Sequence, residues 1–270
     1  MLRSLWTAAS GMKSQQMYVD SIAHNLANVN TVGYKKESME FKSLLYETLR
    51  ASGVDAEGNG SPVSLQVGHG VRASANVKNF TQGSIETTNN PLDFSIDGNG
   101  FFVVQGLNEE KLYSKDGAFK ISIMEDAIRL TTSDGYAVLN SEGEPIEFDT
   151  TFTPSKLVIS ALGEIGYMTD EGVEDLGVTM GMAQFRNVAG LDAIGGNFYK
   201  ATGASGEAIL ESEDDELKKS KIMQGTLESS NVAVVDEMVK MIVAQRAYEL
   251  NSKAITTSDE MLGMANNLKR

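Results

Sequence analysis

Residues 4–29 read SLWTAASGMKSQQMYVDSIAHNLANV and contain no proline. Two sets of residues recur in this stretch at intervals of seven. They are Leu5, Met12, Val19 and Leu26, followed three positions on by Ala8, Gln15, Ile22 and Val29. Heptads of this kind form a narrow apolar seam along one side of a helix, as in a coiled coil. The stretch therefore predicts a helix roughly 40 Å long at about 1.5 Å per residue.

A second heptad pattern occupies the end of the chain. It comprises Val234, Met241, Tyr248, Ile255 and Leu262, supported by Met238 and Ala244. Ser230 or Asn231 can cap the start of this helix, and Asp236 and Glu237 suit the positive end of its dipole. Two seams at opposite ends of one chain are natural partners. We therefore predict that the two helices pair as a coiled coil.

Neither predicted helix confines its apolar residues to the seam. Trp6 and Tyr18 lie outside it on the first helix, and Val235, Val239 and Ile242 form another stripe on the second. A helix that is apolar on more than one side needs more than one partner. We expect lateral contacts at Trp6, Val235, Val239 and Ile242. Either other copies of the chain or its own middle part can cover them, and the sequence leaves both open.

The middle of the chain contains all four prolines and many turn signals. Short apolar or alternating runs, such as residues 71–77 and 101–105, are separated by Asp-Gly pairs, which is typical of antiparallel hairpins. The predicted fold class is α+β, a helical coiled coil with an inserted β-rich domain. The predicted segments are 1–40 (first helix and its terminating motif), 41–61 (connecting segment), 62–221 (β-rich outer domain) and 222–270 (second helix).

Composition limits the classes of partner. The formal net charge is -14, with 37 acidic against 23 basic residues, which argues against nucleic acid or an anionic membrane as a partner. There is no cysteine, which excludes disulfides and thiol catalysis. No stretch approaches the roughly 18 apolar residues of a membrane-spanning helix. The first residues lack the apolar run of a signal peptide, so we expect any export to proceed without a cleaved signal.

The sequence points to no catalytic, cofactor or metal site. His24 and His69 lack a second ligand at metal-binding spacing. Residues 97–100 (DGNG) resemble a calcium loop, but the twelfth loop position holds Asn108 rather than Glu, so we interpret them as a hairpin turn. The glycine-containing stretches have neither a phosphate-loop nor a nucleophile-elbow spacing. A hydrolase using two carboxylates stays formally open, although nothing singles out a pair.

Four motifs, in order along the chain, carry a family resemblance. Residues 25–35 read NLANVNTVGYK, with Asn25, Asn28, Asn30, Gly33 and Tyr34 as the characteristic positions. Residues 90–102 read NPLDFSIDGNGFF, residues 227–232 read LESSNV, and residues 245–254 read QRAYELNSKA. The combination resembles the rod and hook proteins of the bacterial flagellum. The opening residues 3–12, RSLWTAASGM, resemble the distal-rod members most closely.

The resemblance implies a structural role without catalysis. In this family the terminal helices form a coiled coil that lines the inner tube of a helical homopolymer, while the β-domain faces outward. Subunits are exported unfolded by the flagellar type III apparatus and join neighbouring rod and hook subunits. The distal rod acts as a drive shaft in the basal body, passing through the periplasm inside ring bushing proteins. The segment 41–61 resembles the insertion that distinguishes rod from hook subunits.

Two alternatives remain open besides an enzyme. A proximal rod or hook subunit shares the helical motifs and differs mainly after Lys35 and in the middle domain. A secreted adhesion or binding module with a coiled-coil stalk explains the β-domain but not the motifs at both ends. One departure from the family pattern is His24, where Asn is more frequent.

Overall fold

A computed structural model describes residues 2–50, 52–54, 60–61, 63–107, 109–124, 127–148, 153–169, 172–212 and 217–267. The chain forms two compact units. Unit 1 comprises Met1–Ala27, Glu37–Lys78 and Ala233–Arg270, and unit 2 comprises Asn28–Lys36 and Asn79–Val232. The backbone therefore passes from one unit to the other four times.

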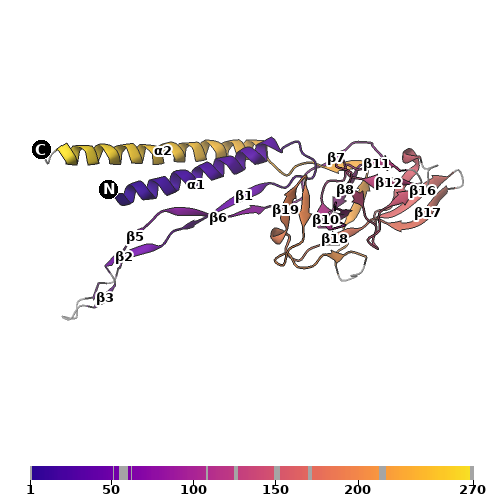
Figure 1. The fold of residues 1–270 in the computed structure, drawn as a ribbon, viewed down its shortest axis with the longest axis horizontal. Helices are drawn as coiled ribbons and strands as arrows, with labels where there is room; N and C mark the ends of the chain where they lie inside the picture. Colours follow the sequence, from indigo (N-terminus) through magenta and orange to yellow (C-terminus); the bar gives the residue numbers. More distant parts are fainter. Residues whose placement is uncertain are drawn as a thin grey trace. The chain divides into compact units, whose positions relative to one another are not determined.

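Two helices of unit 1 confirm the expected helical ends of the chain. Helix α1 (Leu2–Ala27) and helix α2 (Val234–Asn267) run side by side in opposite directions (Figure 1). The predicted capping of the second helix by Ser230 or Asn231 is wrong, because α2 begins at Val234 and the Asn231 side chain bonds other backbone groups. No described helix has a stretch long and apolar enough to cross a membrane.

A long antiparallel hairpin completes unit 1 (Figure 1). Its strand pairs are β1 (Glu37–Ser43) with β6 (Val71–Lys78), β2 (Tyr46–Arg50) with β5 (Leu65–Gly68), and β3 (Gly53–Val54) with β4 (Gly60–Ser61). The segment 41–61, expected to be a connector, supplies one arm of this hairpin and its described end. Residues 63–78, expected in the outer domain, form the returning arm. The strand expected at residues 71–77 is present as β6, but β1, β2, β5 and β6 contain no buried residue, so only their pairing reveals the arm.

The sheets of unit 2 are antiparallel throughout the described residues. The main sheet has the order β11 (Lys120–Ile123), β12 (Ile128–Thr131), β13 (Ala137–Val138), β9 (Phe101–Gln105), β10 (Lys111–Ser114), β20 (Phe198–Lys200) and β19 (Asp192–Gly195). In addition, β14 (Glu147–Phe148) pairs with β12, β18 (Met182–Gln184) with β9, and β21 (Ile209–Leu210) with β18. A three-stranded sheet contains β15 (Leu157–Ile159), β16 (Glu164–Thr169) and β17 (Gly172–Thr179).

Two further strand pairs each include part of one family motif, the second motif in β8 and the third in β23. Strand β8 (Phe94–Asp97) pairs with β22 (Lys221–Gln224), and β7 (Ile85–Thr87) pairs with β23 (Thr226–Glu228). Two 3₁₀ turns, η1 (Pro154–Lys156) and η2 (Val188–Gly190), join other strands. The hairpin predicted at residues 97–100 is wrong, because β8 pairs with β22 and not with the following strand β9. A turn signal marks a change of direction but does not select the partner strand.

The core of unit 2 follows from the apolar run of β9. Successive side chains of a strand point to opposite faces. Phe102 and Val104 enter one buried cluster, whereas Phe101 and Val103 enter the other. A strand with apolar residues at consecutive positions is thus buried on both faces. The hairpin signal Asp134-Gly135 is confirmed, since β12 pairs with β13 across it and Gly135 has φ +88°.

Candidate functional site

The contact face between α1 and α2 contains small and polar residues. Ser4 Oγ lies 3.3 Å from Ser258 Oγ, and a Cβ on Gly11 would lie 2.9 Å from Asn251 Nδ2. Farther along, Asn25 Nδ2 donates to Glu237 at 3.3 Å. Ser4, Gly11 and Asn25 are separated by multiples of seven, as are Glu237, Asn251 and Ser258. The helices therefore face each other along a heptad register that the apolar pattern alone did not reveal.

Most of the predicted seam residues lie on the two helices and are buried to different degrees. Ala8, Ile22 and the supporting Ala244 are buried. Partial burial is found for Leu5, Met12, Val19, Leu26, Met241, Ile255 and Leu262. Val29 lies beyond the end of α1 at Ala27 and belongs to unit 2, so its place on the helix was wrong. Three others are exposed, namely Val234, Met238 and Tyr248. Their assignment to a seam stays a prediction, since a polymer would offer further helices.

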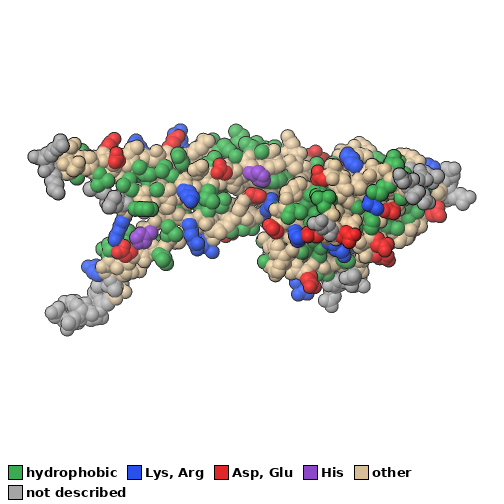
Figure 2. Space-filling model, viewed as in Figure 1, with side chains coloured by type: hydrophobic (Ala, Val, Ile, Leu, Met, Phe, Trp, Pro, Cys, Tyr) green, Lys and Arg blue, Asp and Glu red, His purple; other side chains and the backbone are tan. Residues whose placement is uncertain are grey.

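The residues expected to make lateral contacts are exposed on the helices. Trp6 on α1 is 75% exposed, and on α2 the exposed fractions are 73% for Val235, 55% for Val239 and 57% for Ile242. Figure 2 shows hydrophobic side chains interspersed with charged ones on the surface of the helices. The three residues on α2 follow one another at intervals of four and three positions and form an exposed apolar row, which we call the α2 stripe (Val235, Val239, Ile242).

Asn25 joins three elements of unit 1. Its Nδ2 donates to Glu37 O at 2.8 Å, and its Oδ1 accepts from Glu37 N at 2.8 Å. The third contact is the bond to Glu237, whose carboxylate also accepts from Lys240 Nζ at 2.6 Å. Asn25 is 1% exposed, so its amide satisfies backbone groups that have no access to water. This first motif residue thus fixes the end of α1 to the start of β1 and to α2.

The rest of the first motif ends the helix and enters unit 2. Asn28 Oδ1 accepts from Thr31 Oγ1 at 3.1 Å, whereas Asn30 is exposed. Gly33 has φ +67°, and a Cβ there would lie 2.7 Å from Asp116 N. The left-handed backbone and the close approach both require glycine. Tyr34 is buried.

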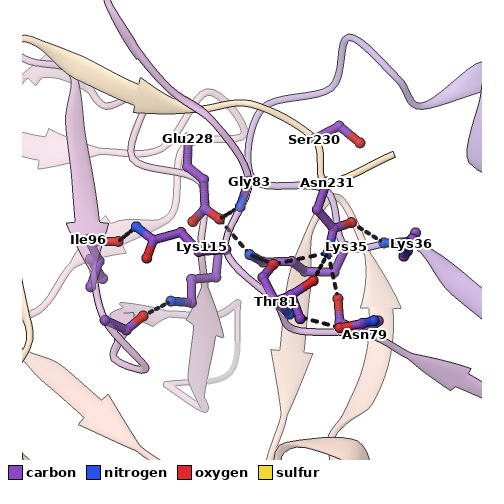
Figure 3. Close-up of polar contacts among 12 residues, drawn as sticks. Lys35, Lys36, Asn79, Thr81, Gly83, Ile96, Lys115, Glu228, Ser230 and Asn231 are labelled. Atoms are coloured by element: carbon purple, nitrogen blue, oxygen red, sulfur yellow. Dashed lines mark hydrogen bonds and ion pairs between the residues drawn. The ribbon is translucent and has the colours of Figure 1, made fainter. Parts of the chain in front are cut away.

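A buried ion pair follows directly after this motif. Lys35 Nζ lies 2.6 Å from Glu228 Oε1, and each side chain is 1% exposed (Figure 3). Lys35 Nζ also donates to Thr81 O at 3.0 Å, and the same Glu228 oxygen accepts from Gly83 N at 2.7 Å. Buried charges persist only when they are paired and hydrogen-bonded. The pair therefore holds the first motif against β23 and against the irregular segment that leads to β7.

Asn231 completes what we call the Lys35 cluster (Lys35, Thr81, Gly83, Glu228, Asn231). Its Oδ1 accepts from Lys36 N at 2.8 Å, and its Nδ2 donates to Asn79 O at 2.8 Å and Thr81 O at 3.0 Å (Figure 3). The cluster thus binds together three segments of unit 2. These are residues 28–36, the segment that begins at residue 79 and the segment that ends at residue 232. All four places where the backbone passes between the units lie at the ends of these segments.

Lys115 lies beside this cluster (Figure 3). Burial lowers the pKa of its ammonium group to about 8, an effect that the carboxylates of Glu228 and Glu211 offset only in part. Its Nζ donates to Gly98 O at 2.8 Å. Among the described residues, Glu228 Oε2 is a buried oxygen without a hydrogen-bond partner. Lys115 therefore adds a second buried ammonium group beside the cluster, in the field of the Glu228 carboxylate that pairs with Lys35.

Sequence reasoning missed the cluster although both of its charged members lie in the quoted motifs. Lys35 ends the first motif, and Glu228 lies in the third, 193 positions away. A charged residue between buried positions of a motif is the signal that could have drawn attention to them. The described residues contain no group of three or more His, Asp or Glu side chains that could hold a metal ion.

Comparison with known proteins agrees with the motif assignments. Residues 5–35 match the family model described as Flagella basal body rod protein. Residues 95–167 match Flagellar hook protein FlgE/F/G D1 domain, and residues 223–268 match Flagellar basal body rod FlgEFG protein C-terminal. The three matches cover both helices and the first half of the β-rich middle.

Individual relatives match the chain from end to end. It is 44% identical to the flagellar basal-body rod protein FlgG of Borreliella burgdorferi, over all of both chains. It is 36% identical to the protein of the same name in Bacillus subtilis, again over both full lengths, and 29% identical to the flagellar hook-basal body complex protein FlhP of that organism. The resemblance predicted from the motifs is confirmed: the chain belongs to the FlgG family of flagellar basal-body rod proteins.

Proposed function

We propose that this chain is a structural subunit of the flagellar distal rod and that it polymerises through its terminal helices into a helical drive shaft that transmits torque from motor to hook. The observation that carries the proposal is the α2 stripe. It lies on a complete 34-residue helix, and each of its three side chains is more than half exposed.

Exposed apolar residues in a row on a helix favour association. Burying a Val or Ile side chain contributes about 1.5–3 kcal/mol, so covering the stripe would stabilise an assembly by roughly 5 kcal/mol per subunit. Trp6 on α1 adds a large exposed ring. Contacts between different surfaces of identical copies generate a helical filament when the rotation from one copy to the next does not close a ring.

The polar face between α1 and α2 supports assembly-coupled ordering. Ser4, Gly11, Asn25, Glu237, Asn251 and Ser258 bury little apolar area. A helix pair of this kind depends on further packing for its stability. We infer that helix ends of the free monomer fray while unit 2 stays folded. Brief proteolysis of a proven monomer should remove the helix ends first, and survival of both ends would contradict this inference.

We infer the partners and the location from the same assignment. The subunit contacts neighbouring rod and hook subunits and the ring proteins that surround the rod, and it resides in the basal body within the periplasm. It is exported by the flagellar type III apparatus without a cleaved signal, and it performs no catalysis. The exposed apolar residues of the helices, the α2 stripe and Trp6, form a surface suited to assembly, which supports a structural role.

The in vitro test changes one stripe residue. Ile242→Asp places a charge on the stripe. The control Ile242→Leu retains the apolar area, and Leu is a good helix former. We expect the Asp variant to stay monomeric at concentrations where the wild type and the Leu variant form filaments in electron micrographs. The near-ultraviolet circular dichroism of unit 2 should be the same for all three. Filaments of the Asp variant with normal yield would refute the role of the stripe.

The cellular test is electron microscopy of basal bodies from cells that lack the gene. A truncated rod without a hook is expected of a missing distal-rod subunit. A complete rod without a hook would instead assign the chain to the hook. Intact, motile flagella would contradict a required role in the rod.

A further inference from the structure

A cavity of about 460 Å³ opens on unit 2 next to the Lys35 cluster. This volume is within the range of small-ligand pockets. Its lining combines aromatic rings, amides and two cations: Asn79, Phe80, Thr81, Asn99, Phe101, Lys115, Gln184, Phe185, Arg186 and Val188. All of these residues belong to unit 2.

The two cations lack a partner carboxylate in the described part of the chain. Lys115 is 3% exposed and makes a single hydrogen bond, to Gly98 O, while its Nζ lies 5.2 Å from the centre of the Phe101 ring. Arg186 is exposed at the rim and makes no ion pair or hydrogen bond with a described residue. A guanidinium group with free donors recognises a carboxylate by two parallel hydrogen bonds.

The charges around Lys115 do not replace such a ligand. Glu228 bonds Lys35 and Gly83, and Glu211 accepts from Ser220 N at 2.7 Å and from Gln184 Nε2 at 2.8 Å. The Asp97 carboxylate also attracts the Lys115 ammonium, whereas the Lys35 ammonium repels the Lys115 ammonium. None of these carboxylates forms an ion pair with the Lys115 ammonium, although Glu228 Oε2 has no hydrogen-bond partner among the described residues.

The aromatic wall gives the cavity a second requirement. Phe101 packs edge-on against Phe80 and Phe185, with ring centres 5.6 and 5.7 Å apart. These packed rings form a fixed apolar surface next to the cations. A bare inorganic anion would leave this surface uncovered. A carboxylate on an apolar carrier fills both parts of the cavity.

We propose that this cavity receives an acidic side chain with an adjacent apolar residue from a second copy of the chain, with Arg186 and Lys115 binding the carboxylate and the phenylalanine rings covering its neighbour. The charge balance favours this occupant, because acidic residues outnumber basic ones by 37 to 23 and every copy presents many carboxylates. Residues 174–176 (Glu-Asp-Leu), exposed on the edge strand β17, have the required chemistry. The inference rests on the proposed polymerisation.

Binding is tested first on the monomer, using benzoate as the probe and benzamide as its neutral analogue. We expect benzoate to shift the amide resonances of residues lining the cavity at millimolar concentration, and benzamide to have little effect. Arg186→Gln removes an exposed side chain without a partner, so folding should be unaffected and benzoate affinity should fall at least about tenfold. Arg186→Lys should recover part of it. Lys115→Met is the second variant, with unit 2 folding checked by circular dichroism.

Assembly is tested second, with filament formation followed by light scattering. We expect benzoate but not benzamide to slow the wild type, and Arg186→Gln to assemble more slowly and to be insensitive to benzoate. Absence of benzoate binding to the monomer would refute the cavity as a carboxylate site. Binding without any effect on assembly would refute the second copy as its occupant. Failure of the untreated wild type to form filaments would instead refute the proposed function, so the two failures are distinguishable.

Discussion

Replacing Lys35 by Met removes one half of the buried ion pair and leaves Glu228 charged in a site closed to water. The two groups lie 2.6 Å apart and are 1% exposed. Breaking such a pair costs about 3–5 kcal/mol, because the remaining charge is shielded from water and has lost its direct partner. The hydrogen bond to Thr81 O is lost as well. We therefore expect Lys35→Met to lower the free energy of unfolding of unit 2 by about 3–5 kcal/mol.

An exposed pair of equal length is the matched control. Lys200 Nζ lies 2.6 Å from Glu110 Oε2, but both side chains are about half exposed, at 49% and 48%. Water screens such a pair, and its contribution is about 0–1 kcal/mol. Lys200→Met removes the same charge from an ion pair of the same length in the same unit. The difference between the two variants thus measures the effect of burial.

Urea unfolding at pH 7 measures both variants, with a separate probe for each unit. Both described α-helices belong to unit 1, so far-ultraviolet circular dichroism follows the helices of that unit. Tyr113 and Tyr199 are buried in unit 2, and their near-ultraviolet circular dichroism follows that unit. The double variant Lys35→Met with Glu228→Gln should recover at least about 1 kcal/mol of the loss, since no unpaired carboxylate remains. A Lys35→Met effect under about 1 kcal/mol, equal to that of Lys200→Met, would refute the reasoning.

Three further perturbations test other parts of the structure. Gly33→Ala should destabilise unit 2 by more than about 2 kcal/mol, because φ is +67° and the new Cβ would clash with Asp116 N. The control Gly135→Ala, at φ +88° with open space around it, should cost only about 1 kcal/mol. Equal losses of stability in urea unfolding would contradict the contribution of the clash. Asn25→Ala should destabilise unit 1 by about 2 kcal/mol or more, because both backbone groups of Glu37 lose their partner. An unchanged unfolding transition of the helices in far-ultraviolet circular dichroism would argue against this role. The pKa of Lys115 in the folded chain, about 8, lies below its ordinary value of 10.5, so the unfolded chain binds more protons between these pH values. The free energy of unfolding should therefore rise with pH across that window, by about 3 kcal/mol in total. Lys115→Met should abolish this rise, and a pH profile of the variant parallel to that of the wild type would count against the burial of the charge.

Local patterns determined much of the architecture. Helix periodicity depends on neighbours three and four residues apart, so the heptads of α1 and α2 were readable without knowledge of any partner. The strand β9 and the turn at Gly135 were predictable for the same reason, since apolar runs and left-handed glycines act within a few residues. The family motifs added the rod assignment, which full-length similarity confirmed.

Pairings between distant segments were decided only by the tertiary structure. Residues 97–100 predicted a turn but not that β8 would pair with β22, more than a hundred residues later. In the arm of unit 1, residues 71–77 predicted a strand but not its partner β1, because the strands of the arm are largely exposed and have no buried face that would select a partner. In both cases the hydrogen-bonding partner of a strand is set by global packing.

The functional details divide along the same line. That Lys35 and Glu228 belong to characteristic motifs was visible in the sequence, and so was the excess of apolar residues on α2. Their meeting as a buried ion pair was not, because a Coulomb interaction depends on distance in space and on exclusion of water, and neither quantity is encoded at a fixed sequence spacing. The same holds for Arg186, Lys115 and three phenylalanines, which the fold of unit 2 brings from four separate segments to one cavity.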